Sequence, residues 1–110
     1  IGKGDEVITV SHPYVATIDV IWHVGATPVL VDVGEDMEMD VNLIEKAITK
    51  KTKAIMPVHL DGRMVNMAKV MKIARKYNLY VIEDAAQAVG AKFKGKLAGS
   101  WGITGNFSFY

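Results

Sequence analysis

The sequence contains no cysteine, which excludes disulfide bonds and any zinc site built on thiolates and fits a reducing compartment. It has no apolar run that approaches the roughly 20 residues of a membrane span, and its start lacks a signal-peptide pattern. It also has no basic run. Its 13 Lys and Arg against 12 Asp and Glu leave a net charge of only +1. These absences favour a cytoplasmic protein and argue against nucleic acid or a membrane as a partner.

Two classes of binding motif are absent as well. The sequence has neither a GxGxxG dinucleotide fingerprint nor a GxxxxGK[ST] phosphate loop, so a nucleotide P-loop is excluded. It has only three histidines, and no two of them are four residues apart. Histidines on one helix face usually bind metal in such pairs, so we expect no metal site.

What is present is ordinary globular sequence: 110 residues, 50% of them hydrophobic, enough for one domain with a buried core. The chain opens without a methionine and stops on the apolar run Phe107-Ser108-Phe109-Tyr110. We therefore expect residues 1–110 to be part of a longer protein.

Apolar runs and helical periodicities alternate along the chain. Asp40 is typical of a helix N-cap, and Gly25 suits the left-handed residue that ends a helix. Such alternation predicts an α/β fold of three layers, α/β/α, in which helices cover both faces of a mostly parallel sheet. The predicted strands are 7–10, 27–33, 53–60, 79–83 and 105–110, and the predicted helices are 16–24, one that begins after residue 40, and 64–77.

The stretch Val81-Ile82-Glu83-Asp84-Ala85-Ala86-Gln87 ends the fourth predicted strand. Ligands of open α/β sheets bind at the carboxyl ends of the strands, so Asp84 is a candidate binding residue. Gln87 would share its face if a helical turn begins there. The alternative is that Asp84 only caps the turn after the strand.

Other polar residues follow the other predicted strands. Tyr14 comes after the first, His59 ends the third and Ser108 lies in the fifth, so with Asp84 and Gln87 they are expected at one edge of the sheet. This set suits a planar cationic heteroaromatic with a phosphate: an aromatic ring for stacking, a carboxylate for a ring N–H⁺, an amide for a ring oxygen and a hydroxyl for phosphate. For His59, a simple hydrogen bond to a loop is the more common role.

Several motifs together resemble one family, the DegT/DnrJ/StrS sugar aminotransferases, which are fold-type I enzymes that use pyridoxal phosphate (PLP). The resemblance covers nearly all of the chain, with the motifs in the same order. The matching segments are Gly4-Asp5-Glu6-Val7-Ile8, Gly25-Ala26-Thr27-Pro28-Val29, Pro57-Val58-His59-Leu60, Ile82-Glu83-Asp84-Ala85-Ala86-Gln87-Ala88, Gly99-Ser100 and Phe107-Ser108-Phe109-Tyr110.

The resemblance implies roles for the candidate residues. Asp84 would partner the pyridine nitrogen, Gln87 the phenolic oxygen of the ring, Tyr14 would stack on the ring and Ser108 would bind the phosphate. The family's Schiff-base lysine lies a few residues beyond the position of Tyr110, so it is not in this chain. The upstream phosphate-binding segment and the small C-terminal domain are also missing, which implies that residues 1–110 are part of the large domain.

The implied activity is transfer of an amino group, typically from glutamate, to a nucleotide-linked keto-sugar in a homodimer. Asp84 would be the catalytic residue within this chain, because a carboxylate keeps the pyridine nitrogen protonated. Two alternatives remain open. Some members of the same family are PLP-dependent sugar dehydratases, in which histidine replaces the lysine, and a non-catalytic α/β ligand-binding module would need only the crevice.

Overall fold

The computed structural model of the chain describes residues 1–11, 15–35, 38–59, 64–84, 92–97 and 99–106. Within these ranges strands and helices alternate, as the sequence predicts. In chain order the elements are β1 (Glu6–Val10), α1 (Val15–His23), β2 (Thr27–Val31), the 3-10 helix η1 (Val41–Leu43), α2 (Ile44–Ala47), β3 (Thr52–Met56), α3 (Met67–Tyr77), β4 (Tyr80–Asp84), β5 (Lys92–Phe93), β6 (Lys96–Leu97) and β7 (Thr104–Asn106).

Strands β2, β1, β3, β4 and β7 form a five-stranded sheet in that order, and every neighbouring pair is parallel. The central strands are β-branched and apolar: β1 reads Glu-Val-Ile-Thr-Val, and its last four residues are buried. Strands of this composition need cover on both faces, as parallel sheets have. The predicted mostly parallel sheet is confirmed.

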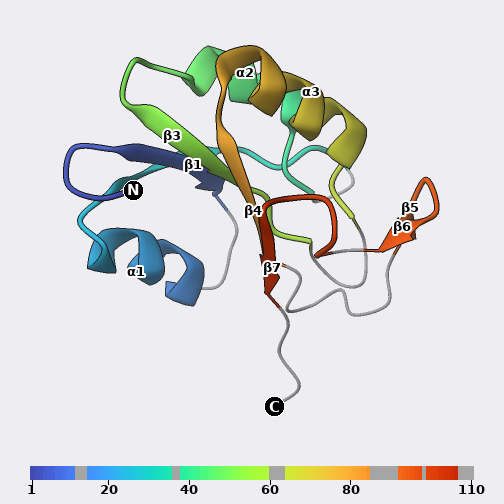
Figure 1. Cartoon of the computed structure of the whole chain (residues 1–110), viewed down its shortest axis with the longest axis horizontal. Coiled ribbons are helices and arrows are strands. Elements are labelled where there is room, and N and C mark those ends of the chain that lie inside the picture. The colour runs from blue at the N-terminus through green and yellow to red at the C-terminus, as the bar shows by residue number, and fades with distance from the viewer. Residues whose placement is uncertain (12–14, 36–37, 60–63, 85–91, 98, 107–110) are drawn as a thin grey trace.

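Helices supply that cover on both faces of the sheet, with α2 and α3 above it and α1 below it in Figure 1. Ile8 packs in one buried cluster with Ile44 of α2 and Val70 of α3. Its neighbour Val7 packs in a second cluster with Ile21 of α1. Successive strand residues point to opposite faces, so the central strands β1, β3 and β4 each contribute to both clusters. The predicted three-layer architecture is confirmed.

Local polar groups set the helix ends. The Asp40 carboxylate accepts the Asn42 N–H (3.0 Å) ahead of η1, as predicted for an N-cap. Gly25 follows α1 with a φ of 85°, the left-handed conformation expected there. The predicted start of the third helix at residue 64 is wrong, because the Asn66 side chain caps the Lys69 N–H (3.3 Å) and α3 begins after it.

The apolar positions of α1 are only partly buried. Ile21 is 2% exposed, whereas Val20 is 57% and Trp22 60% exposed, and Val24, which follows the helix, is 51% exposed. The helix lies one residue earlier than the predicted 16–24, since it spans Val15–His23. None of the helices in the described ranges is long and apolar enough to cross a membrane.

Two predicted strands are shorter than expected. The third ends at Met56 rather than at residue 60, because Pro57 has no N–H for the ladder, and pairing resumes only as a single bridge between Val58 and Asp84. The second ends at Val31, after which Val33 forms an isolated antiparallel bridge. The fourth continues one residue further than predicted, to Asp84.

The end of the described chain differs in detail from the prediction. The turn-rich stretch before residue 102 contains an antiparallel hairpin, β5–β6, which we did not expect. Its turn residues Lys94 and Gly95 have φ of 51° and 77°, as a two-residue primed turn requires. The last strand begins at Thr104 instead of residue 105, and its predicted continuation over 107–110 lies outside the described residues.

The packing of Ile8 gives a test of the core. Ile8 is 0% exposed on the central strand β1. In the protein that contains this chain, Ile8→Ala should lower the free energy of unfolding by about 2–5 kcal/mol and Ile8→Val by about 0.5–1.5 kcal/mol, because each lost methyl group leaves a cavity. Urea denaturation followed by circular dichroism measures both. An Ile8→Ala loss no larger than that of Ile8→Val would contradict the burial of this side chain.

Candidate functional site

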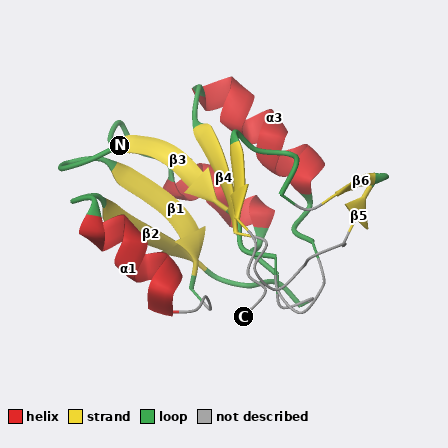
Figure 2. Cartoon of the chain, turned by 60° about the horizontal axis from the view of Figure 1, so that its bottom comes forward, coloured by secondary structure: helices red, strands yellow, loops and turns green. Residues whose placement is uncertain are grey.

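The carboxyl ends of the parallel strands lie at the same end of the sheet, here called the carboxyl edge; the arrowheads of β1, β3 and β4 point toward it (Figure 2). β4 reaches this edge at Asp84. The Asp84 N–H donates to the Pro57 carbonyl oxygen, and the His59 N–H donates to the Asp84 carbonyl oxygen, both at 2.9 Å. The structure therefore brings Asp84 and His59 together, as their positions after neighbouring strands predicted.

The other three candidates, Tyr14, Gln87 and Ser108, lie outside the described residues. Their convergence with Asp84 stays a prediction. Along the chain, Ser108 comes shortly after Asn106, the last residue of β7 and the register partner of Asp84. The described part of the chain thus runs alongside the end of β4 just before Ser108.

The most heavily bonded side chain at the carboxyl edge is one that we did not single out from the sequence, Glu83, which is 0% exposed. Its Oε1 accepts hydrogen bonds from His59 Nε2 and from the Gly99 N–H, both at 3.0 Å. Its Oε2 accepts from the N–H groups of Trp101 and Gly102, both at 2.6 Å. We call this arrangement of Glu83 with His59, Gly99, Trp101 and Gly102 the Glu83 clamp.

Both ring nitrogens of His59 form hydrogen bonds, Nε2 within the Glu83 clamp and Nδ1 with Val65 outside it. Nδ1 accepts the Val65 N–H at 3.2 Å, so it carries no proton, and Nε2 then carries the proton that is donated to Glu83. This tautomer is assigned from the hydrogen-bond network. The interpretation of His59 as a strand-end histidine that bonds a loop is confirmed by the contact with Val65.

The environment of Glu83 keeps it ionised. Burial by itself raises the pKa of this carboxyl, but the hydrogen bonds from His59 and from the backbone of Gly102, Gly99 and Trp101 outweigh burial and hold the pKa below its ordinary value. A buried carboxylate with four donors is therefore charged at neutral pH, beside an imidazole that is neutral in the assigned tautomer. The clamp carries a net negative charge.

Asp84 lies on the other face of β4. Val81 belongs to the cluster under α2 and α3, whereas Ile82 packs against the cluster under α1. Because strand residues alternate, Glu83 shares the face of Val81 and Asp84 shares the face of Ile82. Asp84 is also partly exposed, unlike Glu83. The two consecutive acids therefore occupy different environments and are suited to different tasks.

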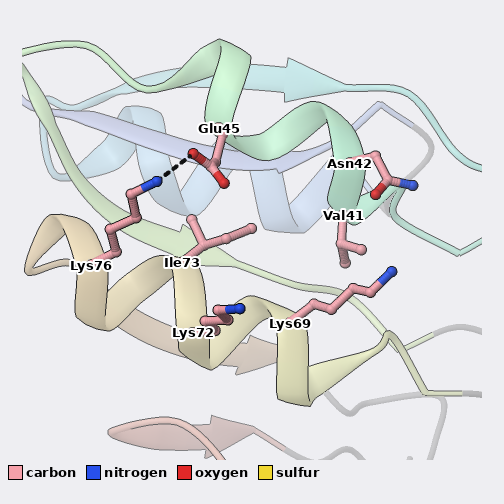
Figure 3. Close-up of a pocket in the computed structure, with 7 residues that line it drawn as sticks. All are labelled: Val41, Asn42, Glu45, Lys69, Lys72, Ile73 and Lys76. Carbon is pink, nitrogen blue, oxygen red and sulfur yellow. Dashed lines mark hydrogen bonds and ion pairs between the residues drawn. The ribbon is translucent and has the colours of Figure 1, made fainter.

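The described ranges contain no group of three His, Asp or Glu side chains that could hold a metal ion. They do contain a pocket of about 360 Å³, lined by residues of η1, α2 and α3 (Figure 3). Charged side chains of α2 and α3 line this pocket, and among them Lys76 forms an ion pair with Glu45 at 3.3 Å. Both side chains are substantially exposed, so this pair is worth little. The pocket contains none of the candidate site residues.

Comparison with known proteins places the chain in a family. The DegT/DnrJ/EryC1/StrS aminotransferase family matches residues 1–110. The chain belongs to this family. The resemblance drawn from the sequence motifs is thereby confirmed.

Two named relatives are close to this chain in sequence. The GDP-perosamine synthase of Caulobacter vibrioides is 50% identical over 111 residues, which cover 100% of this chain and 30% of that protein. The dTDP-3-amino-3,6-dideoxy-alpha-D-galactopyranose transaminase of Aneurinibacillus thermoaerophilus is 52% identical over 110 residues, which cover 99% of this chain and 30% of that protein. The chain spans about a third of the length of these relatives.

A solved structure gives the same result for the fold. Spr1654 of Streptococcus pneumoniae, solved in a PLP form, superposes with a TM-score of 0.93 at 38% identity, covering 100% of this chain and 32% of that one. The parallel sheet and its helices therefore have the α/β fold of the family's PLP-type aminotransferases.

The pKa of Glu83 can be tested directly. In the protein that contains this chain, carbon-13 NMR titration of the Glu83 carboxyl should give a midpoint below the ordinary value of 4.5. Since the folded pKa is lowered, the stabilisation from Glu83 is fully present above pH 4.5 and is lost as the pH falls through the folded pKa. His59→Phe removes one donor and should raise the midpoint. A midpoint at or above 4.5 in the parent would contradict the clamp.

Proposed function

We propose that the carboxyl edge binds PLP and that Asp84 holds the pyridine nitrogen of the cofactor. The observation that supports this proposal is the place of Asp84, at the end of a central parallel strand, partly exposed and on the α1 face of the sheet. Glu83, the adjacent acid, is buried, and its oxygens already accept four hydrogen bonds. Of the two acids, Asp84 is the one that a ligand at this edge can reach.

The chemistry of Asp84 fits this cofactor. A carboxylate forms a charge-assisted hydrogen bond with a protonated ring nitrogen and favours its protonated form. Bound PLP supplies an electron sink for the carbanion that develops at the substrate carbon. The task of Asp84 is to keep a proton on the ring nitrogen. Its main chain is held on both sides, by Pro57 and His59, so the carboxylate starts from a fixed backbone position.

The other candidates keep the roles that the family resemblance implies. We propose that Tyr14 stacks on the ring, Gln87 bonds the phenolic oxygen and Ser108 binds the phosphate. The parallel topology supports this set, because β1, β4 and β7 all finish at the carboxyl edge and these residues follow β1 and β4 or come directly after β7.

We propose that the whole protein transfers an amino group from an amino acid, with glutamate as the donor, to the ketone of a nucleotide-linked sugar. The names of the two relatives above support this class, since one makes a GDP-linked and the other a dTDP-linked amino sugar. The chain covers about 30% of these relatives, and we propose that it is part of the large domain of a longer enzyme, as the family resemblance implies. A homodimer and a cytoplasmic location stay predictions from the sequence.

Asp84→Asn tests this function in the protein that contains the chain. Asparagine keeps the size of the side chain but removes the charge that holds the ring proton, so kcat should fall by several orders of magnitude while the fold is retained. Turnover is measured with glutamate and a panel of nucleotide-linked keto-sugars, and circular dichroism checks the fold.

Asp19→Asn is the matched control for this substitution. Asp19 is exposed on α1, so the same chemical change should leave kcat unchanged there. Turnover of Asp84→Asn close to that of the parent would contradict the role of Asp84.

A further inference from the structure

Glu83 has no part in the proposed chemistry, yet its side chain forms a dense set of polar contacts within the described residues. It is 0% exposed, and its carboxylate accepts four hydrogen bonds. A buried ionised carboxylate is costly unless it is well compensated, and apolar residues of similar volume often replace such groups without loss of stability. A role in filling the core therefore does not explain a charge at this position.

The donors show what the charge organises. Three of the four are backbone N–H groups of residues 99–102, which lie 16 to 19 positions further along the chain. This segment is a turn and not a strand, and three of its N–H groups donate to the Glu83 carboxylate. The Glu83 carboxylate takes the place of a paired strand. It holds a turn segment against the end of β4.

The same segment packs tightly by its backbone. A Cβ at Gly102 would collide with the Val81 carbonyl oxygen, and one at Gly105 would collide with the Gly99 carbonyl oxygen. The Ile103 N–H then donates to the Val81 carbonyl oxygen at 2.8 Å, and β7 begins at the next residue. The clamp therefore fixes the point at which the chain enters β7.

The position at which the chain enters β7 also determines which residues lie beside Asp84. Its residues pair with the end of β4, and Asn106 is in register with Asp84. The fourth donor, His59, fixes the other side: its ring bonds Glu83, and its N–H holds the Asp84 carbonyl oxygen at 2.9 Å. One carboxylate thus links the segments on both sides of Asp84.

We propose that Glu83 is a positioning residue, whose carboxylate, with His59, sets the path of the chain from residues 99–102 through β7 relative to Asp84. The proposal rests on the proposed function, because the chain that leaves β7 leads to Ser108. Glu83 acts from the opposite face of β4 and does not touch the cofactor. It sets the geometry between the group that holds the ring and the segment that follows β7.

The test uses Glu83→Gln in the PLP-loaded protein that contains this chain. Glutamine has the same shape, but its NH₂ group replaces one of the two acceptor oxygens. The two hydrogen-bond donors that bonded this oxygen then face another donor and lose their acceptor. Hydrogen exchange should become about tenfold faster or more at the backbone N–H groups that face the new NH₂ group, which are either Gly99 alone or Trp101 and Gly102, while α3 exchanges as in the parent. PLP should be released about tenfold faster on dialysis.

Two further variants complete the experiment. Glu83→Asp keeps the charge but shortens its reach, so it should fall between the parent and Glu83→Gln in both readouts. Glu45→Gln makes the same change at an exposed glutamate of α2 that bonds Lys76 and Tyr77, and it should leave both readouts unchanged. If Glu83→Gln does not fold, Glu83→Asp and the parent's own exchange rates carry the test.

The outcomes separate this proposal from the proposed function. Faster exchange at Gly99, or at Trp101 and Gly102, together with faster PLP release supports positioning by Glu83. Unchanged exchange, or faster exchange with PLP release as in the parent, overturns it, and so does exchange of the three N–H groups in the parent at the rate of unprotected amides. A parent that binds no PLP overturns the proposed function, while the exchange readout still decides whether the clamp exists.

Discussion

The carboxyl edge of this sheet depends on one buried charge. The Glu83 carboxylate accepts hydrogen bonds from a side chain that follows β3 and from three backbone groups that precede β7. In water each donor would bond solvent, so the net gain per bond is modest; leaving any of them buried without an acceptor would be costly. The clamp therefore works as a unit. The four donors offset the cost of burying the Glu83 carboxylate, and the carboxylate supplies the acceptor that each donor needs.

Because side chains alternate along β4, Glu83 and its neighbour Asp84 lie on opposite faces of the sheet. Glu83 lies on the face covered by α2 and α3, and Asp84 lies on the face covered by α1. Of these two neighbouring acids, Glu83 is the buried carboxylate of the clamp, and Asp84 is a partly exposed carboxylate on the opposite face. The parallel sheet supplies the rest of the arrangement, because it brings the ends of β1, β3, β4 and β7 to one edge.

Much of this fold could be predicted from local sequence. The apolar runs identified the parallel strands, Asp40 identified a helix start, and Gly25 identified a helix end. The local pattern did not predict element ends that are set by a tertiary contact or by the main chain. Pro57 stops a strand that hydrophobicity alone would continue, and the cap at Asn66 delays a helix whose apolar residues begin earlier.

The candidate site divides in the same way. Asp84 and His59 could be placed at one edge from strand order alone, because that argument needs only topology. The role of Glu83 could not, since three of its partners are backbone groups 16 to 19 residues away, and no residue type in the sequence marks a backbone donor. The only sign in the sequence is a pair of consecutive acids at the end of β4, and the rule for strand ends points to the second of them, Asp84.

The most direct test of the central claim is a crystal structure of the protein that contains this chain with PLP bound. We expect the pyridine nitrogen to lie about 2.7–2.9 Å from a carboxylate oxygen of Asp84. We also expect the cofactor on the α1 face of the sheet, with Glu83 keeping its four donors on the other face. Cofactor bound away from the carboxyl edge, or a ring nitrogen held by another residue, would contradict the central claim.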